Sequence, residues 1–192
     1  MNQSKQSPPI RRAGGHQQIT MLVLRAILLS LSFVLSALDH SLPSFVPGVP
    51  GMSLGLANVV VLFALLFLNW KDAVFITVTK SIFVFFLRGP VSLLLSVSGG
   101  LLALFVEILL WKLSRGKVSL MLLSAAGAMS HNVGQIIAYA LYARVAVWIL
   151  IPPLAVMGIV SGVITAIVLK AIYPFMERWF RTHRSYEGEG TQ

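Results

Sequence analysis

The chain has 192 residues, of which 57% are hydrophobic and only 11% are charged, and its mean hydropathy is +0.85. A soluble domain keeps about a quarter of its residues charged, so most of this surface must face lipid instead of water. The formal net charge of +9 would suit a nucleic-acid-binding protein. That function is excluded because the basic residues lie between apolar runs and do not form one basic face. The absence of cysteine excludes disulfides, thiolate metal sites and a cysteine nucleophile.

Six apolar runs predict an all-α, polytopic integral membrane protein with six transmembrane helices, since about 20 apolar residues are needed for each crossing. The runs cover about 19–38, 54–68, 73–87, 91–111 and 118–143, and the last one ends near Tyr173. This last run begins either at Val145 or after Pro152 and Pro153. The first run is too long for the core of a cleaved signal peptide, so we expect it to be retained.

The remaining segments are expected to lie outside the membrane. Residues 1–18 are predicted to be a disordered basic tail, residues 19–176 the transmembrane domain, and residues 177–192 a polar tail. The segment 42–51 is rich in proline and glycine and predicts irregular chain. The run that follows it is short for a crossing unless Met52 and Ser53 extend it.

The basic residues predict the orientation, because loops on the cytoplasmic side are enriched in lysine and arginine. With the N-terminus inside, only Arg88 and Arg144 lie on the outer side. The cytoplasmic side then holds Lys5, Arg11, Arg12, Lys71, Lys112, Arg115, Lys117, Lys170, Arg178, Arg181 and Arg184. We therefore expect a multi-pass protein of the cytoplasmic membrane with both termini in the cytoplasm.

Polar residues inside the apolar runs mark a candidate site, because a charge near the bilayer centre costs several kcal/mol unless it faces protein or a cavity. Most of them lie in the half of the membrane beneath the segment 42–51, which predicts a pocket that is entered from outside. The predicted substrate-binding residues are Asn58, Lys80, Arg88, His131, Asn132 and Gln135.

Each of these residues also has a structural explanation. Asn58 and Asn132 are amides of the kind that hold transmembrane helices together by hydrogen bonds. Lys80 is at a depth comparable to that of Glu107 on the next run and could form an ion pair with it. His131 either lines a cavity or packs in the interior.

Several catalytic signatures are absent from the sequence. There is no phosphate-binding loop of the Walker type, so the chain is not expected to hydrolyse ATP by itself. Prenyl diphosphate synthesis uses magnesium held by clustered aspartates. The only aspartates, Asp39 and Asp72, are predicted on opposite membrane faces. We expect no metal, no cofactor and no catalysis by this subunit alone.

Three motifs carry a resemblance to a known family: Gly55-Leu-Ala-Asn58, Ser98-Gly-Gly100 and Ser130-His-Asn-Val-Gly-Gln135. They resemble the Gx transporter family, which is also labelled heptaprenyl diphosphate synthase component I. Members of that family are similar to the six-helix substrate-binding S-components of energy-coupling-factor importers. The resemblance covers about residues 20–175.

The resemblance implies a bundle like that of an S-component, with a pocket that opens outward under the loop 42–51. It also implies coupling-factor partners, namely a transmembrane subunit and ATPase subunits. The leading hypothesis is therefore a substrate-binding transporter subunit that captures a small anionic metabolite from the outer side. The alternative is a membrane accessory subunit of a heptaprenyl or polyprenyl diphosphate synthase with a soluble catalytic partner.

The topology can be tested because the chain has no cysteine of its own. Single cysteines in the loop 112–117 and in both tails should react only with reagents on the cytoplasmic side. Cysteines at Ser44 or Val49 should react from outside. Labelling of the loop 112–117 from outside would contradict the six-span arrangement.

Overall fold

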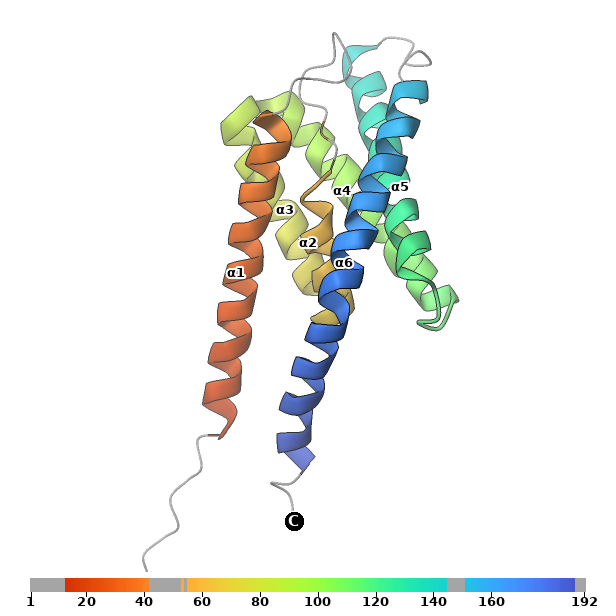
Figure 1. Ribbon diagram of the computed structural model, residues 1–192. Coiled ribbons are helices and arrows are strands. Elements are labelled where there is room, and N and C mark those ends of the chain that lie inside the picture. The colour runs from red at the N-terminus through yellow and green to blue at the C-terminus, as the bar shows by residue number, and fades with distance from the viewer. Residues whose placement is uncertain (1–12, 42–52, 54, 145–150, 189–192) are drawn as a thin grey trace, which may run out of the picture.

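A computed structural model describes residues 13–41, 53, 55–144 and 151–188, and this part of the chain is helical without any strand (Figure 1). The all-α prediction is thereby confirmed. The predicted structure of the loop 42–51 lies outside the described residues, as do most of the N-terminal tail and the last four residues. The helices are α1 (Ala13–Ser41), α2 (Asn58–Phe67), α3 (Trp70–Arg88), α4 (Pro90–Leu113), α5 (Leu120–Ala143) and α6 (Ile151–Gly188).

Local sequence signals explain where the helices begin. Asn69 caps α3, because its side-chain oxygen accepts a hydrogen bond from the Asp72 amide at 3.0 Å. Residues 69–72 are therefore the cap and first turn of a helix. Ser119 caps α5 in the same way, at 3.1 Å from the Leu122 amide. Pro90 is the first residue of α4, where its missing N–H is not needed.

Helix α2 is shorter than the apolar run from which it was predicted. Its 10 residues extend for about 15 Å, roughly half the hydrocarbon thickness of a bilayer. The helix does not extend back beyond Asn58, because Gly55 has a φ of +81°, in the region that favours glycine. The chain turns here, with the Asn58 amide donating to the Gly55 carbonyl at 2.8 Å.

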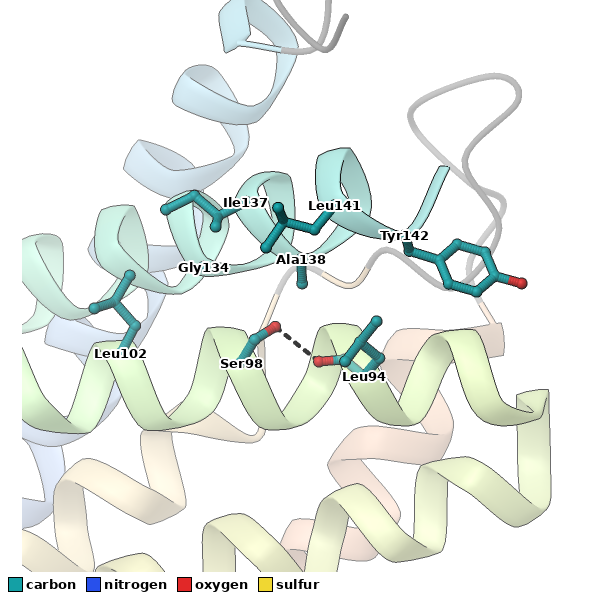
Figure 2. Close-up of a pocket in the computed structure, with 8 residues that line it drawn as sticks. All are labelled: Leu94, Ser98, Leu102, Gly134, Ile137, Ala138, Leu141 and Tyr142. Atoms are coloured by element: carbon teal, nitrogen blue, oxygen red, sulfur yellow. Dashed lines mark hydrogen bonds between the residues drawn. The ribbon is translucent and has the colours of Figure 1, made fainter. Parts of the chain in front are cut away.

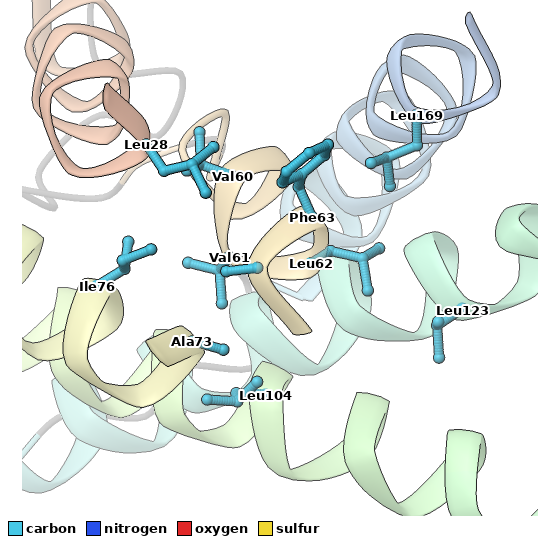
Figure 3. Packing of buried hydrophobic residues seen from close by; sticks show 11 residues of the cluster. Leu28, Val60, Val61, Leu62, Phe63, Ala73, Ile76, Leu104, Leu123 and Leu169 are labelled. Atoms are coloured by element: carbon cyan, nitrogen blue, oxygen red, sulfur yellow. The ribbon is translucent and has the colours of Figure 1, made fainter. Parts of the chain in front are cut away.

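The apolar core surrounds α2 (Figure 3). Val60, Val61, Leu62, Phe63 and Ala64 are at most 6% exposed, so nearly every face of this helix is buried. The other five helices each contribute side chains to the same cluster: Leu28, Ala73, Ile76, Leu104, Leu123 and Leu169. Helix α2 is thus the central element around which the bundle packs.

The other helices form a bundle in which successive elements run in opposite directions. Helices α3, α4, α5 and α6 pack consecutively against one another, and α1 contacts α2 and α3. In Figure 1, α1 and α6 stand on either side of α2 and reach beyond its end. The first turn of α1 and the last turn of α6 lie at the same end of the bundle. This arrangement agrees with an even number of crossings.

Three helical segments are long and apolar enough to cross a membrane: Gln18–Ser41, Pro90–Leu113 and Ala155–Arg178. Their mean hydropathies are 2.3, 2.3 and 2.2. A membrane protein is therefore supported, whereas six crossings and the side on which the termini lie stay predictions. Helices α3 and α5 are long but less apolar, because polar side chains such as Lys80 and Gln135 are buried against their neighbours.

The Asp39 carboxylate holds the irregular segment that precedes α2. Its Oδ2 atom accepts hydrogen bonds from the backbone amides of Gly55 at 2.8 Å and Leu56 at 3.2 Å. Backbone groups that are buried away from water and outside a helix need such partners. Asp39 itself is 6% exposed, and these amides help to stabilise its negative charge.

We predict that Asp39→Ala loosens this segment. Hydrogen bonds to a charged group contribute about 1.5–3 kcal/mol, so amide exchange at Gly55 and Leu56 should become roughly ten- to hundredfold faster. Hydrogen exchange with mass spectrometry is the measurement. Asp72→Ala is the control, because it removes the exposed pair with Arg25 at the other end of the bundle. Unchanged exchange in Asp39→Ala would contradict the assignment.

Candidate ligand-binding site

Asn58 and Lys80 meet because α2 and α3 form a helical hairpin. The chain reverses at Leu68 and Asn69, and each of the two residues lies roughly 15 Å along its helix from this reversal. The Lys80 ammonium group donates a hydrogen bond to Asn58 Oδ1 at 2.7 Å. Both side chains are buried, at 3% and 7% exposed. The hairpin therefore places a lysine and an amide at mid-depth in the bundle.

His131 and Gln135 lie one turn apart on α5, across Gly55 from Asn58. Their Nε2 atoms are 2.9 Å apart, and Gln135 Nε2 also donates to Ser53 Oγ at 3.1 Å. Gly55 fits between the two pairs of residues. A Cβ atom on Gly55 would lie 2.9 Å from Asn58 Nδ2 and 3.4 Å from His131 Nε2. We call Asn58, Lys80, His131 and Gln135 the polar cluster, which Ser53 and Gly55 contact.

Two glycines of α4 shape the polar cluster, and reasoning from residue chemistry missed them. A Cβ on Gly99 would lie 2.9 Å from His131 Nδ1 and 3.0 Å from Gln135 Cγ. A Cβ on Gly100 would lie 2.7 Å from a methyl group of Thr77 and 4.0 Å from Lys80 Cε. The α4 backbone therefore approaches α5 and α3 more closely than a side chain would permit. The available signal was the Ser98-Gly-Gly100 motif, which did not reveal a contact with His131.

Two buried carboxylates act on the charge of Lys80. Asp39 and Glu107 both interact electrostatically with the buried ammonium group. Glu107 is 3% exposed and packs against Gly127 of α5, where a Cβ would overlap its carboxylate. In the described part of the chain, Lys80 and Glu107 do not form an ion pair within 4 Å. The lysine is thus held directly by Asn58, while Glu107 acts on it from a greater distance.

Arg88 and Asn132 lie apart from the polar cluster. Arg88 is exposed at the end of α3, roughly 12 Å along the helix from Lys80. Its guanidinium donates to the backbone carbonyl of His40 at the end of α1. Asn132 faces α6, because a Cβ on Gly158 would lie 2.9 Å from its Nδ2 atom. Four of the six predicted site residues therefore come together.

The polar cluster retains unused hydrogen-bonding capacity. His131 Nδ1 and Gln135 Oε1 are buried and have no hydrogen-bond partner among the described residues. A buried polar group left in this state costs about 1–3 kcal/mol, so such groups call for an explanation. A ligand that hydrogen-bonds to them would remove this cost. Within the described residues, no set of His, Asp and Glu side chains is arranged to hold a metal ion.

Comparison with known proteins gives one match. The sequence model of the family described as heptaprenyl diphosphate synthase component I matches residues 28–172, a range that contains the whole polar cluster. No curated protein and no solved structure matches the chain. Because the match extends over most of the sequence, the chain belongs to the heptaprenyl diphosphate synthase component I family.

Proposed function

We propose that the protein is the substrate-binding membrane subunit of a small-molecule transporter, and that it captures a small anionic metabolite from the outer side. The observation that carries this proposal is the polar cluster, because it gathers hydrogen-bonding groups from three helices inside an apolar bundle. Ionisable residues inside a membrane domain are costly and typically mark substrate or ion pathways. His131 Nδ1 and Gln135 Oε1, which have no hydrogen-bond partner among the described residues, are available to a ligand.

Lys80 is the residue that favours an anionic group in the ligand. Its ammonium group has three N–H donors, of which Asn58 takes one. Asp39 Oδ2 accepts hydrogen bonds from two backbone amides. Among the described residues, no ion pair within 4 Å joins Asp39 to Lys80. Lys80 can therefore donate to a carboxylate or phosphate of the ligand. Glu107 limits how much negative charge the site accepts.

Ser53 and Gly55 would have to respond to the ligand. Ser53 takes a hydrogen bond from Gln135, and Gly55 packs against His131. A ligand that bonds to these side chains replaces those contacts. The energy for release would come from coupling-factor partners, namely a transmembrane subunit and ATPase subunits, which the likeness to S-components suggests.

The family match favours a second candidate function. The name "component I" implies a partner subunit, and the synthase description suggests a membrane subunit that recruits a soluble prenyl-transferring partner. Two measurements separate the candidates. A small metabolite that co-purifies with the gently purified protein in native mass spectrometry supports transport. Prenyl transfer that requires this chain plus a soluble partner, measured in an activity assay, supports the second function.

The first test concerns His131 and Gln135. Removing one hydrogen-bonding partner from a buried site costs about 1–3 kcal/mol, so His131→Ala and Gln135→Ala should weaken binding of the co-purified metabolite roughly 5- to 150-fold. The thermal stability of the ligand-free protein should change little. Asn132→Ala is the matched control, since it faces α6 and should lower stability without changing affinity. If all three variants behave alike, the groups are packing contacts and the site is refuted.

The second test separates a ligand-binding lysine from a structural one. Lys80→Met should abolish binding of the same metabolite, because the ammonium group that meets its anionic group is lost. Adding Glu107→Gln should not restore that affinity, although it removes the carboxylate left without its counter-charge. Isothermal titration of both variants is the measurement. Recovered affinity in the double variant would show that Lys80 serves only to balance Glu107.

A further inference from the structure

A groove lies between α4 and α5 at the end of the bundle that carries Arg88 and Arg144 (Figure 2). Its volume is about 600 Å³, within the range of sites that bind small molecules. Leu94, Ser98 and Leu102 line it from α4, and Ala138, Leu141 and Tyr142 line it from α5. The Ser98 hydroxyl donates to the Leu94 carbonyl at 2.7 Å, so its donor is already used inside the helix. The groove is therefore almost entirely apolar.

The groove is separate from the polar cluster. At its floor, a Cβ on Gly134 would lie 2.7 Å from the Ser98 carbonyl oxygen and 2.8 Å from Gly99 Cα. The two helices are therefore in backbone contact there, and His131 and Gln135 lie behind that contact against Gly99. A ligand in the groove does not reach these side chains.

The groove opens toward the region where lipid is expected. Helix α4 is one of the segments apolar enough to span a membrane, and the lining residues Leu94 and Leu141 are 42% and 77% exposed. From Gly134 to Tyr142 the groove follows α5 for roughly 12 Å. An apolar channel of this length, open to the bilayer, suits a hydrocarbon chain that lies along the helices.

The rim of the groove suits a phosphate headgroup. Tyr142 is 60% exposed one residue before α5 ends, a position where tyrosine commonly lies at the membrane interface. Arg144 follows as the C-cap, with a φ of 53° that is uncommon for a residue other than glycine. Within the described residues Arg144 forms no ion pair, whereas Arg88 already donates to the His40 carbonyl. Guanidinium groups are well suited to bind phosphate.

We propose that this groove binds one acyl chain of an anionic phospholipid from the outer leaflet, with Arg144 at the lipid phosphate. The apolar groove accounts for the chain, and Arg144, which follows the lining residue Tyr142 by two positions and forms no ion pair with the described residues, accounts for the charge of the headgroup. This lipid site lies outside the polar cluster and is independent of the transported metabolite.

The test uses the full chain in lipid nanodiscs that contain phosphatidylglycerol with a photoactivatable acyl chain. Mass spectrometry then locates the cross-linked residues. Cross-links should concentrate on the lining residues of α4 and α5. Ser98→Phe fills the groove and should remove most of this labelling, whereas Leu101→Phe, on the same helix but outside the lining, should leave it unchanged.

The headgroup is tested by a matched pair of arginine variants. Arg144→Gln should lower groove labelling by phosphatidylglycerol roughly fivefold, because one basic residue near an anionic lipid surface contributes about that much. Arg88→Gln should not lower it. Labelling spread evenly around the bundle, or an equal loss in the two arginine variants, would overturn the proposal. So would competition by a polyprenyl phosphate but not by unlabelled phosphatidylglycerol, since the occupant would then be an isoprenoid. Both variants change exposed residues, and Arg88→Gln also removes the hydrogen bond to the His40 carbonyl.

Discussion

The structure depends on the burial of a helix that is too short to cross a bilayer. Helix α2 is packed on nearly every face by the other five helices, and its start lies at mid-depth. Residues 55–57, directly before it, therefore lie inside the bundle without being helical. Irregular backbone at that depth is tolerated only where protein satisfies its polar groups. Asp39 meets this requirement for Gly55 and Leu56.

The position of α2 also explains why the polar cluster forms where it does. Because α2 begins at mid-depth, its first residue, Asn58, faces Lys80 on the neighbouring helix. The segment before it brings Ser53 to Gln135 and Gly55 to His131. The proposed binding site, composed of side chains on rigid helices and one irregular segment, can exchange internal contacts for ligand contacts. That property suits a subunit that captures and releases its substrate.

The charged groups are arranged differently in the interior of the bundle and at its surface. Inside, Lys80 is opposed by Asp39 and Glu107, so uncompensated charge is limited in a region of low dielectric constant. At the surface, Arg88 donates to the His40 carbonyl at the end of α1, and Arg144 caps α5 two residues after Tyr142, which lines an apolar groove. The polar cluster and the groove therefore differ in chemistry, although only the close α4–α5 contact at Gly134 separates them.

The amino-acid sequence alone determined the helical class, the approximate limits of most helices, the apolar character of the chain and the family, because hydropathy and short motifs are local properties. It also singled out Asn58, Lys80, His131 and Gln135 as candidates, since polar residues inside apolar runs are conspicuous. Only the tertiary structure decided which of them meet. Asn132 turned to α6 and Arg88 to the end of α1, because helix rotation and depth depend on packing between helices. Helix α2 begins later than its apolar run, and Gly99 lies beside His131. Both features arise from contacts between segments distant in sequence, which no local pattern encodes.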